Sequence, residues 1–242
     1  MNAFRHLCAS AALGTTLVSG CGPLPGQPHK GSETPAPNEV SEFRTLYADN
    51  CSGCHGPEGR GGAAIALADP VYLAIVDDAA VRAVIAGGVR GTSMPPFAQS
   101  AGGMLTDKQI DVIASEMRSR WSRHGILDGA TPPSYTAKSQ GDARQGEAVY
   151  GRYCESCHGA GGRGGAKGSG ITKDAFLALV SDQGLRTIVI TGRPDLGAPD
   201  WRGNVPGKPM TDQEITDVVS WLASRRVQSP GQPYSASNEP PH

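Results

Sequence analysis

Two copies of one short motif, each with two cysteines and a histidine, carry the clearest chemistry in this chain of 242 residues. The motif is Cys-x-x-Cys-His, and its members are Cys51, Cys54 and His55 in the first copy and Cys154, Cys157 and His158 in the second. Two thiols at this spacing add across the two vinyl groups of one porphyrin edge, and the next residue is then placed to bind the iron. We therefore predict two covalently bound haem c groups, with His55 and His158 as iron ligands.

A Cys-x-x-Cys pair has two other common uses, a thioredoxin-like redox pair and half of a zinc site. Thioredoxin motifs lie between a strand and a helix, and no β-branched run precedes either pair here. A zinc site would take four ligands from two such pairs, which gives the copies no reason to lie in separate, self-similar segments. The histidine that follows each second cysteine favours haem.

The remaining cysteines, Cys8 and Cys21, lie in the first 21 residues. These residues have the pattern of a secretory signal, because a short apolar run over 7–18 follows a weakly charged start. The run ends in Val-Ser-Gly-Cys21, which resembles the lipobox of bacterial lipoproteins. We predict export to the periplasmic side of a bacterial membrane and a lipid anchor on Cys21. An ordinary cleavage site that leaves a spare thiol is the alternative.

Stretches rich in proline and glycine divide the rest of the chain. We predict a flexible tether over 22–40, a linker over 125–140 and a disordered tail over 228–242, since these stretches hold too little apolar surface to form a core. The segments between them, 41–124 (the first repeat) and 141–227 (the second repeat), match each other in sequence. Each repeat is small for a domain, so a haem would supply part of its apolar mass.

Matching positions in the two repeats predict the helices. A tyrosine, Tyr47 or Tyr150, lies four residues before each first cysteine, and 84–87 aligns with 189–192. The pairs Thr106 with Gln109 and Thr211 with Glu214 form capping boxes, which predict a closing helix in each repeat. A first helix precedes each motif, with Val40, Phe43, Leu46 and Tyr47 on one face in the first repeat. Segments near 79–85 and 184–190 suit a third helix or a strand, and the rest is interpreted as loop.

Each repeat resembles a small class I cytochrome c domain, and the whole chain resembles bacterial membrane-attached dihaem cytochromes c. The resemblance covers 41–227 and implies an all-α fold of two tandem class I cytochrome c-like domains, each a few helices around a covalently bound haem. In this family a glycine and an aromatic residue meet where the first and last helices cross. Gly146 and Trp221 match these positions in the second repeat, whereas Phe43 and Glu116 take them in the first. We therefore expect the bulky side chain at this crossing to come from the first helix in the first repeat and from the last helix in the second.

The resemblance also implies a methionine as the second iron ligand, on the loop before the last helix and followed by proline. Met94 fits this position in the first repeat. In the second repeat Ala198 takes the same place, and alanine cannot bind iron. Met210 lies nearby and is the weaker alternative as a ligand of the second iron, because it aligns with Leu105, a position that we expect to pack in the core. The second haem is therefore predicted to be five-coordinate, water-bound or ligated from outside its repeat.

These observations favour an electron carrier, not an enzyme: a membrane-tethered protein that passes single electrons between redox proteins or a membrane redox complex. A haem enzyme or small-ligand-binding module that uses the open site of the second haem is one alternative, with Asp200 as the nearest carboxylate. A fixed subunit of a larger respiratory or photosynthetic complex is another. The formal net charge of −1 gives no sign of nucleic-acid binding.

Overall fold

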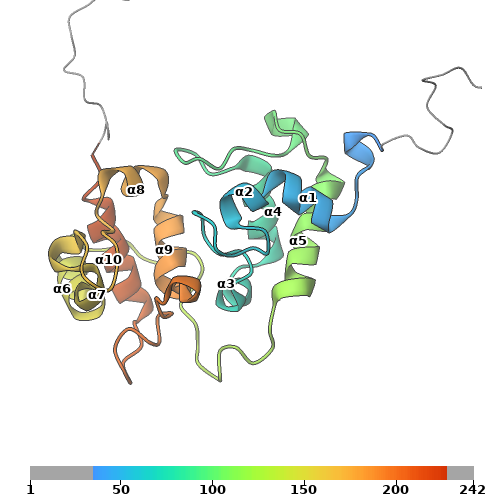
Figure 1. Ribbon diagram of the computed structural model, residues 1–242. Coiled ribbons are helices and arrows are strands. Elements are labelled where there is room, and N and C mark those ends of the chain that lie inside the picture. The colour runs from blue at the N-terminus through green and yellow to red at the C-terminus, as the bar shows by residue number, and fades with distance from the viewer. Residues whose placement is uncertain (1–34, 228–242) are drawn as a thin grey trace, which may run out of the picture. The chain divides into compact units, whose positions relative to one another are not determined.

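The computed structural model describes residues 35–227, and every regular element in that range is a helix (Figure 1). The all-α fold predicted from the sequence is therefore confirmed. The signal peptide with Cys8 and Cys21, most of the tether and the tail over 228–242 lie outside the described residues. Within 35–227, no helix has the length and apolar character that a bilayer crossing needs.

The two repeats contain the same series of helices. The first repeat holds α1 (Phe43–Asn50), α2 (Ser52–His55), α3 (Pro70–Ile75), α4 (Asp78–Gly87) and α5 (Asp107–Trp121). The second holds α6 (Ala143–Tyr153), α7 (Glu155–His158), α8 (Asp174–Leu179), α9 (Asp182–Thr191) and α10 (Asp212–Ala223). Short 3-10 turns at Pro37–Glu39, Gln99–Ala101, Ala160–Gly162 and Pro194–Leu196 complete the series. Each cysteine motif thus forms its own short helix directly after the first long one.

Both capping boxes form as the sequence predicts. The Thr106 hydroxyl accepts a hydrogen bond from the Gln109 amide at 3.2 Å, and the Gln109 side chain accepts one from the Thr106 amide at 2.9 Å. Thr211 and Glu214 repeat both bonds at 3.2 Å and 2.9 Å. Each box satisfies amides that have no partner within the helix, so α5 and α10 begin where the sequence indicates.

Helices α3 and α8 were missed by the sequence interpretation, which treated both segments as loop. Asp69 begins α3 as an N-cap, because its Oδ1 accepts from the amides of Val71 and Tyr72 at 2.8 Å and 2.9 Å. Pro70 then occupies the first helical position, where a missing amide hydrogen costs nothing. The cap signal was present in the sequence, but six residues are too few to show helical periodicity. The ambiguous segments near 79–85 and 184–190 are the helices α4 and α9.

In each repeat an arginine in or just after the closing helix binds the carbonyls at the end of the short helix α3 or α8. The Arg118 guanidinium donates to the carbonyls of Leu73 and Val76 at 2.6 Å and 2.8 Å and pairs with Asp78. Arg226 makes the same three contacts with Leu177, Val180 and Asp182. Arg118 lies within α5, whereas Arg226 follows the end of α10, so the two arginines reach equivalent partners from different sequence positions.

The closing helices cross the first helices differently in the two repeats. A Cβ atom on Gly146 would lie 2.1 Å from the Asp217 carbonyl, so only glycine permits the close approach of α6 and α10. Tyr150 stacks on Trp221 there, with ring centroids 4.4 Å apart. In the first repeat, the ring of Trp121 meets Phe43 and Tyr47 edge-on at 5.6 Å and 5.2 Å. Tyr47 thus has two aromatic partners, Phe43 on its own helix with ring centroids 5.6 Å apart and Trp121 on α5, five residues beyond Glu116. Phe43 supplies bulk from the first helix, as the sequence predicts, and Trp121 adds an aromatic ring from the closing helix.

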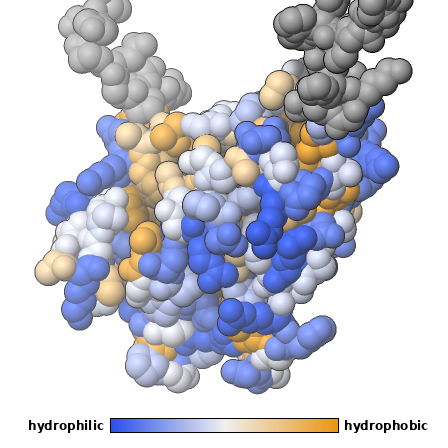
Figure 2. Space-filling view, turned by 45° about the vertical axis from the view of Figure 1, so that its right-hand side comes forward, coloured by the Kyte–Doolittle hydropathy of each residue, from blue (hydrophilic) through white to orange (hydrophobic). Residues whose placement is uncertain are grey.

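Apolar side chains form two buried clusters, one built mainly from each repeat. Helix α3 contributes to both, since Tyr72 and Leu73 belong to the first cluster and Val71 belongs to the second. Helix α3 also packs against α9. On the face that Figure 2 shows, hydrophilic residues cover much of the centre, and hydrophobic residues show at the upper left, at the upper right and in smaller patches at the bottom. Among residues 35–227, the large apolar side chains that remain exposed are Met104, Leu179, Leu196 and Val227.

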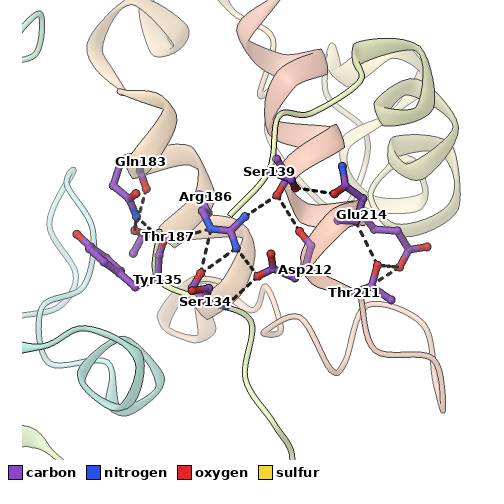
Figure 3. A network of polar contacts seen from close by, with 11 residues as sticks. Ser134, Tyr135, Ser139, Gln183, Arg186, Thr187, Thr211, Asp212 and Glu214 are labelled. Carbon is purple, nitrogen blue, oxygen red and sulfur yellow. Dashed lines mark hydrogen bonds and ion pairs between the residues drawn. The ribbon is translucent and has the colours of Figure 1, made fainter. Parts of the chain in front are cut away.

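The linker is held by contacts with both repeats. Arg186, whose side chain keeps only 3% of its exposure, donates to the carbonyls of Ser134 and Tyr135 at 2.8 Å and 3.2 Å (Figure 3). Arg186 also pairs with Asp212 at 2.5 Å, and that carboxylate accepts from the Ser134 amide at 2.8 Å. The Tyr135 ring lies against Tyr72 of the first repeat, with centroids 6.4 Å apart. Residues 134–135 are therefore fixed, although the linker forms no helix.

The folded part also begins earlier than the sequence interpretation placed it. Pro37–Glu39 forms a 3-10 turn inside the stretch that we predicted to be tether. The Gln109 side chain donates to the carbonyls of Pro37 and Val40 at 2.8 Å and 2.9 Å. The Gln109 side chain thus both caps α5 and holds the segment that leads into α1.

Candidate functional site

Each cysteine motif occupies a single helical turn. In α2 the His55 amide donates to the Cys51 carbonyl at 3.0 Å, and in α7 the His158 amide donates to the Cys154 carbonyl at 2.9 Å. Side chains three and four positions apart lie on one face of a helix. The two thiols and the imidazole of each copy therefore share a face, and all four motif cysteines are free thiols.

The two histidines are oriented by the same backbone contact. Nδ1 of His55 lies 2.8 Å from the Ile65 carbonyl oxygen, and Nδ1 of His158 lies 2.8 Å from that of Ser169. A carbonyl oxygen only accepts, so the proton of each neutral imidazole resides on Nδ1 and Nε2 keeps a free lone pair. A ring that is fixed in this way is ready to bind a metal through Nε2.

Tyr47 and Tyr150 hold the chain that leaves each motif. The Tyr47 hydroxyl donates to the Gly56 carbonyl at 2.9 Å, and Tyr150 does the same to Gly159 at 2.5 Å. Both glycines have a positive φ, and a Cβ atom would come within about 2 Å of a main-chain oxygen, at 1.8 Å for Gly56 and 2.1 Å for Gly159. In each repeat the tyrosine and the glycine thus stabilise the same kind of turn, after which the chain runs back toward the histidine.

Burial shifts the pKa of His55 and of the first cysteine in each motif. Burial lowers the pKa of His55, which favours the neutral imidazole that a metal requires. Burial and the neighbouring motif thiol raise the pKa of Cys51 to about 11 and that of Cys154 to about 12. Thioredoxin-like cysteines need the opposite shift, toward a reactive thiolate. The partly buried Cys51 and Cys154 therefore lack the reactive thiolate that disulfide exchange requires.

The loops before the closing helices place Met94 and Ala198 at equivalent positions. Gly88, with φ +65°, is the C-cap of α4, and Gly192, with φ +67°, is the C-cap of α9. The amide of the next residue donates to the carbonyl of Met94 in one loop and of Ala198 in the other, at 3.0 Å in both. The sequence interpretation paired Gly87 with Gly192, whereas the helix ends pair Gly88 with it. Its match of Ala198 with Met94 agrees with the loop geometry.

Met210 occupies a core position. Its amide donates to the Trp201 carbonyl at 3.0 Å, as the Leu105 amide donates to the Phe97 carbonyl at 2.8 Å. Met210 is 3% exposed and Leu105 is 4% exposed, and each belongs to the apolar cluster of its repeat. The Met210 sulfur also lies 4.0 Å from the Asn204 side-chain nitrogen. The structure thus aligns Met210 with Leu105, as the sequence interpretation did.

The other candidate groups are already paired. The Asp200 carboxylate binds the Arg202 guanidinium at 2.6 Å and accepts from the Arg202 backbone amide at 2.9 Å. The motif cysteines lie in α2 and α7 or cap their first turns, and the two repeats form separate cores, which is not the arrangement of one shared zinc site. Sequence reasoning missed Arg193, which donates to the carbonyls of Gly62 and Ala64 in the first repeat. Nothing in the local pattern around Arg193 indicated these partners.

Two helical Cys-x-x-Cys-His turns with histidines held through Nδ1, on a helical scaffold, define a protein of the cytochrome c class. The chain belongs to the family described as cytochrome C oxidase, cbb3-type, subunit III, whose model matches residues 38–115 and 141–222. Membership implies a covalently bound haem c with its iron. The free thiols and the oriented Nε2 atoms fit that group.

Curated relatives are similar at modest identity. A cbb3-type cytochrome c oxidase subunit FixP from Azorhizobium caulinodans is 27% identical over 191 residues, which is 75% of this chain and 59% of the relative. The FixP subunit of Sinorhizobium medicae is 30% identical over 136 residues, which is 52% of this chain and 40% of the relative. The chain therefore spans about half the length of these relatives.

Two solved structures resemble the fold more loosely. A reducing HAO-like protein complex of Kuenenia stuttgartiensis gives a TM-score of 0.45 at 18% identity, covering 79% of this chain and 99% of that one. Thiosulfate dehydrogenase from Marichromatium purpuratum gives a TM-score of 0.28 at 22% identity, covering 76% of this chain and 42% of that one. At these scores neither likeness bears on function.

Proposed function

We propose that this protein is a dihaem electron carrier, with one haem c in each repeat and residues 41–124 and 141–227 as the two haem-binding units. The observation that carries the proposal is the duplicated contact between a motif histidine and a backbone carbonyl, at 2.8 Å in both repeats. A structural cysteine pair has no need of such a contact. A metal-binding imidazole does, because the contact fixes the tautomer and the ring direction.

In this proposal the side chains of the chain hold and shield the cofactor. The motif cysteines attach it, His55 and His158 bind from the proximal side, and the apolar clusters keep water away. When bound, haem c supplies one-electron exchange between ferric and ferrous iron. Electron transfer at a haem edge needs no acid or base from the protein.

The two haems are unequal in this account. Met94 completes the ligand pair of the first haem, and a histidine and methionine pair raises the reduction potential. Ala198, at the matching backbone position, offers no ligand, and Met210 is held in the core. The second haem therefore has an open or weakly occupied sixth position and a lower potential.

Ala198, which cannot bind iron, also favours a second candidate function, the binding of a small ligand at the second haem. Catalysis there would need a distal acid or base. Asp200 is bound to Arg202, so the carboxylate that the sequence offered for this role is already engaged. This pairing supports the carrier over the enzyme.

We further propose that the protein is exported, lipid-anchored at Cys21 on the periplasmic side of a bacterial membrane, and paired there with redox proteins or a membrane redox complex. The lipobox-like sequence supports the anchor. The FixP relatives are named as subunits of cbb3-type cytochrome c oxidase, which supports a membrane complex as partner. A role as a fixed subunit of such a complex is compatible with the same site.

Haem stoichiometry tests the proposal. The full chain, produced in cells that attach c-type haem, should hold two haems that stay bound in acid and organic solvent. Replacing both cysteines of one motif by alanine should remove one haem, and doing so in both motifs should remove both. A wild-type chain with one haem, or with haem that the solvent extracts, would overturn the dihaem proposal.

A further inference from the structure

One side chain of the second repeat reaches the proximal loop of the first. Arg193, directly after the glycine that ends α9, places Nη2 at 3.1 Å from the Gly62 carbonyl oxygen and Nη1 at 3.4 Å from that of Ala64. Asp195 accepts from the Gly61 amide at 3.3 Å. The two residues thus contact three main-chain groups of the segment 61–64 in the other repeat.

Arg193 and Asp195 also bind each other in a fork. Nε of Arg193 lies 2.9 Å from one carboxylate oxygen, and Nη2 lies 2.8 Å from the other. Each side chain keeps 16% of its exposure, so water screens the pair only partly. A bidentate pair of this kind holds both groups in one geometry.

The contacted segment belongs to the site of the first motif. The Ala64 amide donates to the Cys54 carbonyl at 2.9 Å, and the next residue, Ile65, accepts from His55 Nδ1. A Cβ atom on Gly62 would lie 2.2 Å from the Cys54 carbonyl, so the segment lies directly against α2. Arg193 and Asp195 therefore hydrogen-bond to the loop that orients His55.

Arg193 belongs at the same time to the distal loop of the second repeat. Its backbone amide donates a hydrogen bond to the Ala198 carbonyl at 3.0 Å, and the Ala198 amide donates one to the Arg193 carbonyl at 3.0 Å. One residue thus joins the loop that lacks a methionine to the loop that holds His55.

We propose that Arg193 and Asp195 are positioning residues that dock the distal loop of the second repeat on the proximal loop of the first and set the reduction potential of the haem at His55. The inference rests on the proposed function. A positive charge near a haem iron stabilises the ferrous state, and a negative charge stabilises the ferric state. The intact pair is close to neutral, so removing either partner exposes the charge of the other.

Single and double variants of the full holoprotein test this. Arg193→Gln should lower the potential of the first haem, and Asp195→Asn should raise it. The double variant should lie between them, and Arg193→Lys, which keeps the charge, should shift the potential less than Arg193→Gln. Arg225→Gln and Glu147→Gln provide the control, because that pair is more exposed and contacts only the second repeat.

Two readouts are needed, a spectroelectrochemical titration in which electron paramagnetic resonance distinguishes the haems, and hydrogen exchange over 61–64. Asp195→Asn should speed exchange at the Gly61 amide, which loses its acceptor. Shifts of the same sign in the two single variants, or shifts no larger than those of the control pair, would overturn the inference. A wild-type chain without two haems would instead overturn the proposed function, so the two failures are distinguishable.

Discussion

Met94 and Ala198 occupy the same backbone position in the two distal loops, because each carbonyl accepts a 3.0 Å hydrogen bond from the residue after a helix-ending glycine. The two loops follow the same path, but only the first carries a methionine, which we propose as an iron ligand. The chain therefore carries two sites with the same proximal geometry and different distal groups.

The crossing of α6 and α10 depends on the absence of a side chain at Gly146. We expect Gly146→Ala to destabilise the holoprotein by about 1–3 kcal/mol, because the added methyl must displace the backbone of α10. Gly151→Ala is the matched control in the same helix, since its Cβ would meet only the Glu155 carboxylate at 3.7 Å. That variant should gain about 0.5–1 kcal/mol. Urea unfolding measures both, and equal effects would contradict the account of the crossing.

Arg186 holds the linker, and we expect Arg186→Met to cost about 3 kcal/mol of stability. The variant leaves the carbonyls of Ser134 and Tyr135 and the Asp212 carboxylate without their shared donor. Arg152→Met is the control, because the Arg152 side chain is 46% exposed and pairs at the surface with Glu214. Its cost should stay below about 1 kcal/mol. Limited proteolysis over 124–140 should speed up only in Arg186→Met, and an unchanged cleavage rate would contradict this role.

The stability that Asp195 contributes should depend on pH. The hydrogen bonds from Arg193 hold the pKa of the Asp195 carboxyl below its usual range in the folded chain. An acid with a lowered folded pKa stabilises the fold above its unfolded pKa, about 3.9, and loses that contribution as the pH falls through the folded value. The stability difference between wild type and Asp195→Asn should therefore be full at pH 6 and shrink below about pH 4. In an Arg193→Gln background this pH dependence should largely vanish, and its persistence would contradict the assigned cause.

Cys21 should determine membrane attachment. We expect the wild-type protein to partition with membranes, and Cys21→Ser to release it or to leave an unprocessed precursor, because lipid chains supply about 0.8 kcal/mol for each buried methylene. Cys8→Ser, in the same leader, is the control and should leave partitioning unchanged. Cell fractionation with mass spectrometry of the mature N-terminus measures this. A soluble periplasmic wild-type protein would contradict the anchor.

Much of the architecture followed from local patterns. The capping boxes at Thr106 and Thr211 and the Cys-x-x-Cys-His motifs encode their structure within a few residues, so helices and candidate ligands could be predicted together. Helices α3 and α8 could not, because six residues show little periodicity and only the N-cap Asp69 signalled one of them.

Local sequence patterns could not predict which segments distant in the sequence contact each other. Arg193 and Gly62 lie 131 residues apart in sequence, and no pattern around either residue indicates that they meet. Trp121 lay on the predicted apolar face of its helix, but its meeting with Tyr47 depends on where α1 and α5 cross. Tertiary packing, not local preference, decides such pairs.

The spin state of the two haems tests the central claim most directly. Electron paramagnetic resonance and carbon monoxide binding on the purified holoprotein should show a low-spin first haem that is inert to the gas and a high-spin or weakly ligated second haem that binds it. Met94→Ala should convert the first haem to the second type, whereas Met210→Leu, which places the residue of the matching core position, should leave both spectra unchanged. Two low-spin haems in wild type, with the second turned high-spin by Met210→Leu, would contradict the claim and identify Met210 as the ligand.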